Sequence, residues 1–326
     1  MDPHRIPRAG SERHRGLHRA GESLNRARLA GAGLVAFAAI AFSAKAILVK
    51  LAYRHGVDPL TLLSLRMGFS LPFFLVMAAW ANRDGAAGRL GAGDWRAIVF
   101  LGMLGYYLAS LFDFYGLQHI TAALERLVLF LYPTFVVLIA AALHGRRIGR
   151  RDVLALALSY VGIALVFVHD LKAGQGNVAL GAFWVLLSAL CYAVYLIGNG
   201  RMVQKMGSVL FACLASLVSC VAVLAHYALV APDVTGIFRL PAAVYGLSLV
   251  MALLSTVMPV VLMSEGIRRV GSSHASMIGT VGPVATIFMG AGFLDEPITA
   301  IQLAGAALVV AGVLAITLAK TPQKAG

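Results

Sequence analysis

Charge is scarce in this sequence of 326 residues, and acidic residues are scarcer than basic ones. Charged residues make up 13% of the chain, 60% of it is hydrophobic, and the mean hydropathy is +0.84. Soluble domains carry roughly 25% charged residues, so a soluble globular fold is excluded. The three cysteines, Cys191, Cys213 and Cys220, lie in apolar stretches at no metal-ligand or disulfide spacing, and we expect no metal site and no cofactor.

The sequence also lacks the short motifs of ATP-driven and hydrolytic proteins. It has no Gly-x-x-x-x-Gly-Lys-[Ser/Thr], no His-Glu-x-x-His and no Gly-x-Ser-x-Gly. An ATP-driven pump is therefore excluded, and an intramembrane enzyme stays only as a weak alternative. No filter-like loop is visible, which disfavours a channel.

Long apolar runs fill the sequence instead. A membrane-spanning helix needs about 20 mostly apolar residues, and ten such runs are present. They are 31–52, 59–81, 97–117, 121–142, 153–169, 178–199, 208–230, 241–265, 274–293 and 300–319. The expected fold class is an all-α integral membrane protein with short loops, so function must be carried by the helices.

The basic residues are distributed as a topology signal. If the N-terminus is cytoplasmic, the tails and loops on the cytoplasmic side contain 20 Lys and Arg residues, and the loops on the other side contain 3. This ratio predicts that both termini are cytoplasmic in the inner membrane. Residues 1–30 carry seven arginines and little that could form a core, and we expect a disordered cytoplasmic tail there, with a second tail at 320–326. The net charge of +13 is then explained by orientation and anionic lipid, not by nucleic acid.

An internal repeat divides the chain. A shift of 150 residues aligns Pro133 with Pro283, Gly162 with Gly312, and Gly116 with Gly266. The repeats extend over 31–170 and 177–319, each with five spans. Because five is odd, the second repeat crosses the membrane in the opposite sense. Inverted repeats are common in secondary transporters, with the substrate site between them near the midplane.

Several short motifs resemble one known family. They are Phe42-Ser43-Ala44 with Lys50, Pro59 with Arg66, Ala123 to Pro133, Leu294-Asp-Glu-Pro-Ile298, and Gly305-Ala-Ala with Gly312. In this order they resemble the ten-helix EamA-type permeases of the drug/metabolite transporter superfamily. The resemblance implies export of amino acids or other small metabolites, or of organic cations. The chain differs from the family at Phe42-Ser43, where Trp-Gly is usual, and at the charged Glu125-Arg126.

Charged residues within the predicted spans are the first candidates for a site, because each costs about 2.5 to 3.5 kcal/mol on insertion scales. Two interpretations stay open: a substrate or coupling site, or internal ion pairs. Near a helix end, Lys50 is expected to reach the interface. Arg66 is expected to clamp a carboxylate through two N–H groups. The six residues are Lys45, Lys50, Arg66, Asp113, Glu125 and Arg126.

Aromatic and hydroxyl residues accompany these charges. Tyr106, Ser110 and Asp113 share one helix face, and Asp113 and Glu125 lie at equal depth. Tyr192 and Tyr195, together with Trp184, could stack against a substrate ring or simply pack against neighbouring helices. In the second repeat Ser276 and Thr280 are candidates to line the cavity, with close helix packing as the alternative. The hinge candidates inside spans are Pro133, Pro259 and Pro283.

The mixture of both charge signs favours an amphoteric substrate. A zwitterionic amino acid needs a cationic and an anionic partner, whereas an organic cation needs carboxylates and aromatic faces without basic residues. We expect a secondary transporter of small metabolites, most favourably amino acids, working outward by alternating access. Efflux of organic cations or drugs is the alternative. If protons are coupled, Asp113 or Glu125 is the expected carrier.

Overall fold

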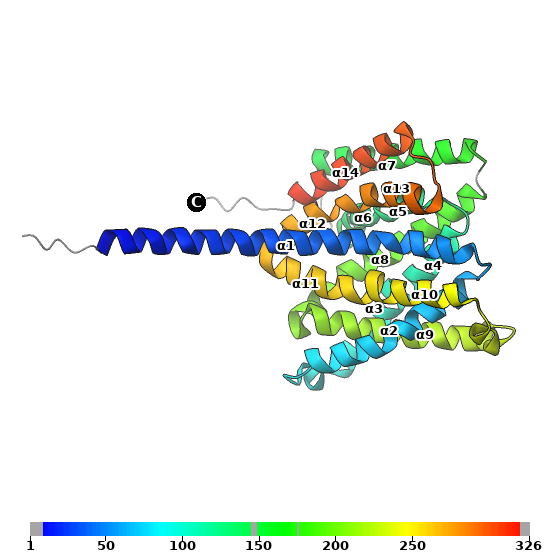
Figure 1. The fold of residues 1–326 in the computed structure, drawn as a ribbon, viewed down its shortest axis with the longest axis horizontal. Coiled ribbons are helices and arrows are strands. Elements are labelled where there is room, and N and C mark those ends of the chain that lie inside the picture. The colour runs from blue at the N-terminus through cyan, green and yellow to red at the C-terminus, as the bar shows by residue number, and fades with distance from the viewer. Residues whose placement is uncertain (1–8, 145–148, 175, 320–326) are drawn as a thin grey trace, which may run out of the picture.

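The chain forms helices throughout the part that the structure describes. The computed structural model describes residues 9–144, 149–174 and 176–319, and no strand occurs within these ranges (Figure 1). The first half consists of α1 (Ala9–Tyr53), α2 (Pro59–Ala81), α3 (Ala92–Gly102), α4 (Ala109–Leu117), α5 (Ala122–Leu129), α6 (Tyr132–His144) and α7 (Arg150–Lys172). A π-helical turn, Met103–Leu108, joins α3 to α4.

The second half repeats this order. It consists of α8 (Val178–Met206), α9 (Ser208–Val230), α10 (Ala242–Ala252), α11 (Met258–Val270), α12 (Ser272–Gly279), α13 (Val281–Leu294) and α14 (Ala300–Ala319). A π-helical turn, Leu253–Val257, joins α10 to α11. Nine membrane-spanning candidates result in the described part, and the shorter apolar stretch Ala300–Ala315 on α14 completes the expected ten.

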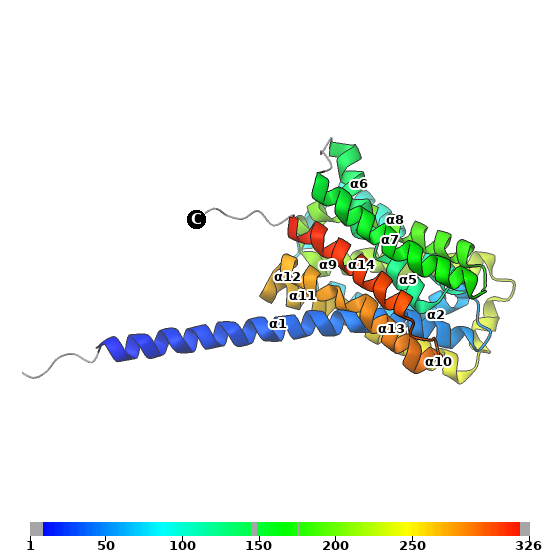
Figure 2. The same ribbon diagram turned by 90° about the horizontal axis from the view of Figure 1, so that it is seen from above.

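Some boundaries differ from the sequence prediction. The third span begins at Ala92, five residues early, and α8 continues to Met206. The expectation of a disordered tail over 1–30 is wrong for residues 9–30, which continue α1 as helix beyond the bundle (Figures 1 and 2). Residues 1–8 and 320–326 lie outside the described residues.

Local signals explain several helix starts. Asp58 Oδ1 accepts hydrogen bonds from the backbone N–H groups of Leu60 and Thr61, both at 3.0 Å, and Pro59 occupies the first turn of α2. The Thr121 hydroxyl accepts from Leu124 N at 3.1 Å and starts α5. Both caps satisfy backbone N–H groups that a helix start leaves unpaired.

Glycine contacts follow the 150-residue repeat. A Cβ on Gly162 of α7 would lie 2.6 Å from the Gly305 carbonyl of α14, and one on Gly312 would lie 2.6 Å from the Ala155 carbonyl. The two contacts are equivalent under the repeat, because a shift of 150 converts Gly162 to Gly312 and Ala155 to Gly305. The α7 and α14 helices lie side by side (Figures 1 and 2), so glycine allows their backbones to approach closely.

A second pair of contacts obeys the same relation. A Cβ on Gly116 of α4 would meet the Gly181 carbonyl of α8 at 3.0 Å, and one on Gly266 of α11 would meet the Gly31 carbonyl of α1 at 3.1 Å. Corresponding helices therefore make corresponding contacts. The two halves pack as a pseudo-symmetric pair, with α1 and α8 running in opposite senses.

Each of the three predicted hinge prolines follows an interruption of its span. Pro133 comes just after the break between α5 and α6, and Pro283 just after the break between α12 and α13. Pro259 is the second residue of α11, directly after the π-helical turn. Each proline therefore lies in the first turn of its helix, where a backbone N–H group would have no partner within the helix.

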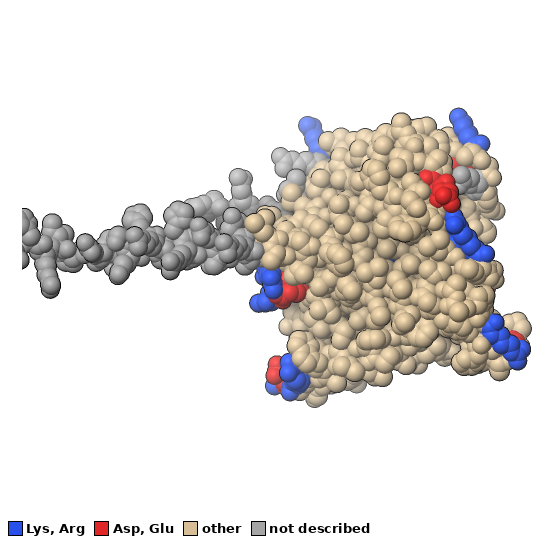
Figure 3. Space-filling view, in the orientation of Figure 1, with Lys and Arg blue, Asp and Glu red and all other residues tan. Residues whose placement is uncertain are grey.

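The surface matches a bilayer environment. In Figure 3 the described charged side chains gather at the two ends of the bundle, and the band between them carries almost none on the visible face. Large apolar side chains are exposed in that band, among them Phe73, Val76 and Phe183. An apolar belt between two polar rims is what a multi-pass membrane protein requires.

Candidate functional site

A cavity of about 510 Å³ lies between the two halves. Its walls come from α1, α2, α4 and α5 of the first half and from α8, α9, α11 and α12 of the second. It extends to Asn199 and Val203 on α8, Ser208 at the start of α9, and Ile267 on α11. The cavity therefore reaches the end of the bundle from which α1 projects.

Lys45 forms the centre of a buried ion cluster at the inner limit of this cavity. Its ammonium pairs with Asp113 and, at 3.3 Å, with Glu125 Oε1. The exposed fractions of Lys45, Asp113 and Glu125 are 5%, 2% and 0%. Asp113 lines the cavity directly, whereas Glu125 lies behind Lys45. A three-helix ion cluster thus joins α1, α4 and α5, as the equal depth of the two carboxylates predicts.

Arg66 does not make the carboxylate clamp expected of it. Its Nε donates to Thr256 Oγ1 at 2.8 Å, and its guanidinium lies 5.5 Å from the Phe114 ring centroid. Nη1 is buried without a hydrogen-bond partner among the described residues. The Arg66 side chain extends instead to Thr256 of the second half, and the two carboxylates pair with Lys45.

Arg126 is held by aromatic rings and not by a carboxylate. The centre of its guanidinium lies 5.1 Å from the Phe42 ring centroid and 5.3 Å from that of Phe130. Its Nε is buried with no hydrogen-bond partner in the described structure. Lys45 Nζ also lies over the Phe42 ring, at 5.5 Å. One ring therefore stands beside both cations.

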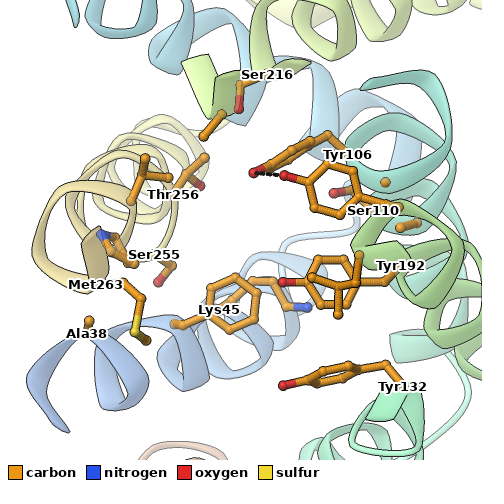
Figure 4. Close-up of a pocket in the computed structure, with 18 of the residues that line it drawn as sticks. Ala38, Lys45, Tyr106, Ser110, Tyr132, Tyr192, Ser216, Ser255, Thr256 and Met263 are labelled. Atoms are coloured by element: carbon orange, nitrogen blue, oxygen red, sulfur yellow. Dashed lines mark hydrogen bonds between the residues drawn. The ribbon is translucent and has the colours of Figure 1, made fainter. Parts of the chain in front are cut away.

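The tyrosines form the opposite wall. Tyr106 and Tyr195 share a hydrogen bond at 3.2 Å and an edge-to-face contact at 5.2 Å. Tyr192 stacks on Tyr195 at 5.7 Å. In Figure 4, Tyr106, Tyr192 and Tyr132 face Ser255, Thr256 and Met263 across the open space, and Ser110 lies beside the tyrosines.

Glycine makes this tyrosine wall possible. A Cβ on Gly105, in the first π-helical turn, would lie 2.3 Å from Tyr195 Cγ. No real Cβ makes such a contact, so Tyr195 rests directly on the bare backbone. Trp184, in contrast, lies outside the cavity and stacks on Phe112 at 5.4 Å.

The serine and threonine candidates of the second half are placed less directly. The Thr280 hydroxyl donates to the Met277 carbonyl at 2.6 Å, and Thr280 is not among the residues that line the cavity. The Ser276 side chain lies outside the described part of the structure. Ala275 and Gly279 of α12 line the wall instead.

Sequence reasoning missed the aromatic partners of the cations. Phe42, Phe130 and Tyr132 line the cavity, yet each reads as an ordinary apolar residue of a membrane helix. The 150-residue shift contains the missing signal, since it aligns Phe42 with Tyr192 and Lys45 with Tyr195. Phe42 and Lys45 of α1 thus correspond to two tyrosines of α8.

Polar contacts close the other end of the bundle, far from the end where α1 extends out of it. Lys50 Nζ donates to the Ile120 carbonyl at 2.7 Å and pairs with Glu296 Oε1 at 3.3 Å, so Lys50 is partnered instead of free at the interface. Glu296 Oε1 also accepts from Ala122 N at 3.1 Å, at the start of α5. We call Lys50, Glu296 and Ala122 the ionic latch. It connects the loop before α14 to α1 and α5.

Within the described ranges, no group of three His, Cys, Asp or Glu side chains is placed to hold a metal ion.

Comparison with known proteins agrees with this architecture. The EamA-like transporter family matches the chain twice, over residues 29–168 and 179–318. The chain belongs to the EamA-like transporter family. It is an integral membrane protein of ten transmembrane helices in two inverted five-helix repeats, and the family marks it as a transporter of small molecules.

Individual relatives are also transporters by name. The uncharacterized transporter YcbK of Bacillus subtilis is 31% identical over 289 residues, which cover 87% of this chain and 92% of YcbK. A probable terminal-alkyne amino-acid exporter of Streptantibioticus cattleyicolor is 28% identical over 240 residues, covering 71% and 77% of the two chains. These names indicate a transporter and not an enzyme.

One solved structure, described only as the crystal structure of a protein, shares the fold. It superposes with a TM-score of 0.61 at 18% identity, and the match covers 90% of this chain and 99% of the other. At this identity the likeness concerns the fold alone.

Proposed function

We propose that this protein is a secondary transporter that moves small zwitterionic metabolites, most favourably amino acids, out of the cell. The observation that carries the proposal is the cavity between the halves, with Lys45, Asp113, Arg66 and Arg126 on its walls. Both signs of charge stand within one buried space. A zwitterion can pair its ammonium with a carboxylate and its carboxylate with a guanidinium there.

Transport by alternating access follows from the two inverted halves. The excess of basic residues at one end of the spans supports a cytoplasmic location for both termini in the inner membrane. The cavity then opens toward the cytoplasm and the ionic latch closes the outer side. This corresponds to the loading state of an exporter, and the bends at Pro133, Pro259 and Pro283 are the proposed hinges.

Asp113 and Glu125 are the proposed proton carriers if the transporter uses the proton gradient. Both are buried beside the Lys45 ammonium, and each has one oxygen without a hydrogen-bond partner, Asp113 Oδ1 and Glu125 Oε2. A proton on either oxygen would loosen the pair with Lys45. Substrate binding and proton binding would then compete for the same carboxylates.

One relative supports the substrate class. The Streptantibioticus cattleyicolor protein is named a probable amino-acid exporter, and its similarity extends over most of both chains. Efflux of organic cations is the second candidate, favoured by the tyrosines of the cavity. Tyr106, Tyr132 and Tyr192 present ring faces or edges to a cation, beside the carboxylate of Asp113.

Transport in proteoliposomes tests the proposal. Purified protein is reconstituted and assayed with labelled neutral amino acids, nucleosides and quaternary ammonium compounds, with and without a pH gradient. We expect saturable transport of amino acids, with empty liposomes and a Lys45→Ala variant as controls. Transport of the quaternary ammonium compounds alone would establish the second candidate. Transport of no panel member by folded protein would refute the metabolite-carrier proposal.

A further inference from the structure

The buried cluster at the cavity holds an excess of positive charge. Lys45, Arg66 and Arg126 stand against only Asp113 and Glu125, and all five side chains are at most 5% exposed. Both carboxylates pair with Lys45. The five charges sum to +1, and neither guanidinium makes a direct ion pair with a carboxylate among the described residues. Because an unpaired buried charge is costly, this arrangement calls for an anion that the chain itself does not provide.

Arg126 is the better placed of the two arginines to receive that anion. The Phe42 and Phe130 rings hold its guanidinium at 5.1 and 5.3 Å, and neither ring takes up its in-plane N–H groups. Nε is buried and unpartnered, and the residue lines the cavity. Arg66, by contrast, already donates from Nε to Thr256.

Arg126 packs closely against the backbone of α13. A Cβ on Gly282 would lie 2.8 Å from Arg126 Nη2 and 3.4 Å from Nε, so any larger residue there would displace the guanidinium. Glycine at this position therefore keeps the guanidinium where it is. Gly279, three residues earlier on α12, lines the same cavity as Arg126.

The negative subsite lies close by. The Phe42 ring stands beside both the Arg126 guanidinium and Lys45 Nζ, which is paired with Asp113. Asp113 Oδ1 has no hydrogen-bond partner. Asp113 and Arg126 both line the cavity, so this one space offers a zwitterion an acceptor for its ammonium group and a donor for its carboxylate.

We propose that Arg126 binds the carboxylate of the substrate and is the residue that makes the transporter select carboxylates over the matching amides and amines. The inference rests on the proposed function and assigns its anionic subsite. A guanidinium donates two parallel hydrogen bonds to a carboxylate. A carboxamide has only one acceptor oxygen and no charge, so it binds more weakly.

The test compares each amino acid that the wild type transports with its amide and its decarboxylated amine. The measured quantity is the ratio of inhibition constants, amide over acid, in proteoliposomes. We expect this ratio to be roughly 10 to 100 in the wild type, the worth of a charged hydrogen bond, and to fall close to one in Arg126→Gln. The exposed Arg83 serves for the matched Arg83→Gln control, in which the ratio is unchanged.

The outcomes separate this inference from the proposed function. An Arg126→Gln variant that still prefers the acid overturns the Arg126 assignment and leaves the proposed function standing. Equal weakening of acid and amide in folded protein also overturns it. A wild type that prefers the amine refutes the zwitterion proposal itself, and the Arg126 assignment falls with it. If Arg126→Gln does not fold, Arg126→Lys replaces it, with an intermediate ratio expected.

Discussion

Neutralising Glu296 should open the transporter at the end that carries the ionic latch. Glu296→Gln removes the ion pair with Lys50 but keeps an acceptor for the Ala122 N–H group. The pair is 3.3 Å long and its side chains are 25% and 13% exposed. A pair of this exposure contributes about 1 kcal/mol, and a carboxylate at a helix start contributes about 0.3 to 1 kcal/mol. The combined loss is about 1 to 2 kcal/mol.

That loss converts to a roughly 5- to 30-fold increase in the population open at the latch end. The assay uses Ser110→Cys, which lines the cavity, in a background without the native Cys191, Cys213 and Cys220. A membrane-impermeant maleimide is added from the latch side only, and the labelling rate is measured. When opening is fast relative to labelling, the rate is proportional to the open population.

A matched control exists at the other end of the bundle. Asp94 pairs with Lys205 and accepts from Gly91 N at 2.9 Å, so it also combines an ion pair with a helix start. Asp94→Asn should not increase labelling from the latch side. An unchanged rate in Glu296→Gln, or an equal increase in Asp94→Asn, would refute the reasoning that the latch holds its end of the bundle closed.

Two further predictions concern packing and coupling. Gly105→Ala should destabilise the protein by about 1 to 3 kcal/mol, because its Cβ would enter the Tyr195 ring. In the control Gly68→Ala, with open space around the new Cβ, stability should change by less than about 1 kcal/mol. Thermal unfolding in detergent measures both variants, and equal stability of the two contradicts the packing argument. Asp113→Asn or Glu125→Gln should abolish the pH dependence of transport if that residue carries the proton. An unchanged pH profile in both variants removes them from that role.

The fold was predictable from the sequence because a bilayer imposes simple rules on it. Length, hydropathy and the 150-residue shift predict the ten spans, and the shift also aligns glycines that make corresponding close contacts, such as Gly162 with Gly305 and Gly312 with Ala155. The same rules single out Lys45, Asp113 and Glu125, because a charge within a span stands out against apolar neighbours. Their predicted equal depth agrees with the ion cluster.

The details of the site were less predictable, because they depend on where each side chain points and not on its depth in the membrane. Sequence spacing cannot tell whether Arg66 reaches a carboxylate or Thr256, and the structure shows the latter. Phe130 gave no signal, since a phenylalanine in a membrane helix is ordinary until a guanidinium lies beside it, and the departure from the family at Phe42 did not indicate a contact with Arg126. The π-helical turns also leave no mark in hydropathy.

Those two π-helical turns bear on the history of the chain. Met103–Leu108 and Leu253–Val257 begin 150 residues apart, at the same position of each half. A π-helical turn inserts one residue into an α-helix and rotates everything beyond it. Two independent insertions at one position are far less economical than one insertion followed by duplication. The ancestral five-helix unit therefore already contained this turn, and the side chains that now differ between the halves, such as Lys45 and Tyr195, diverged on a backbone that both copies inherited.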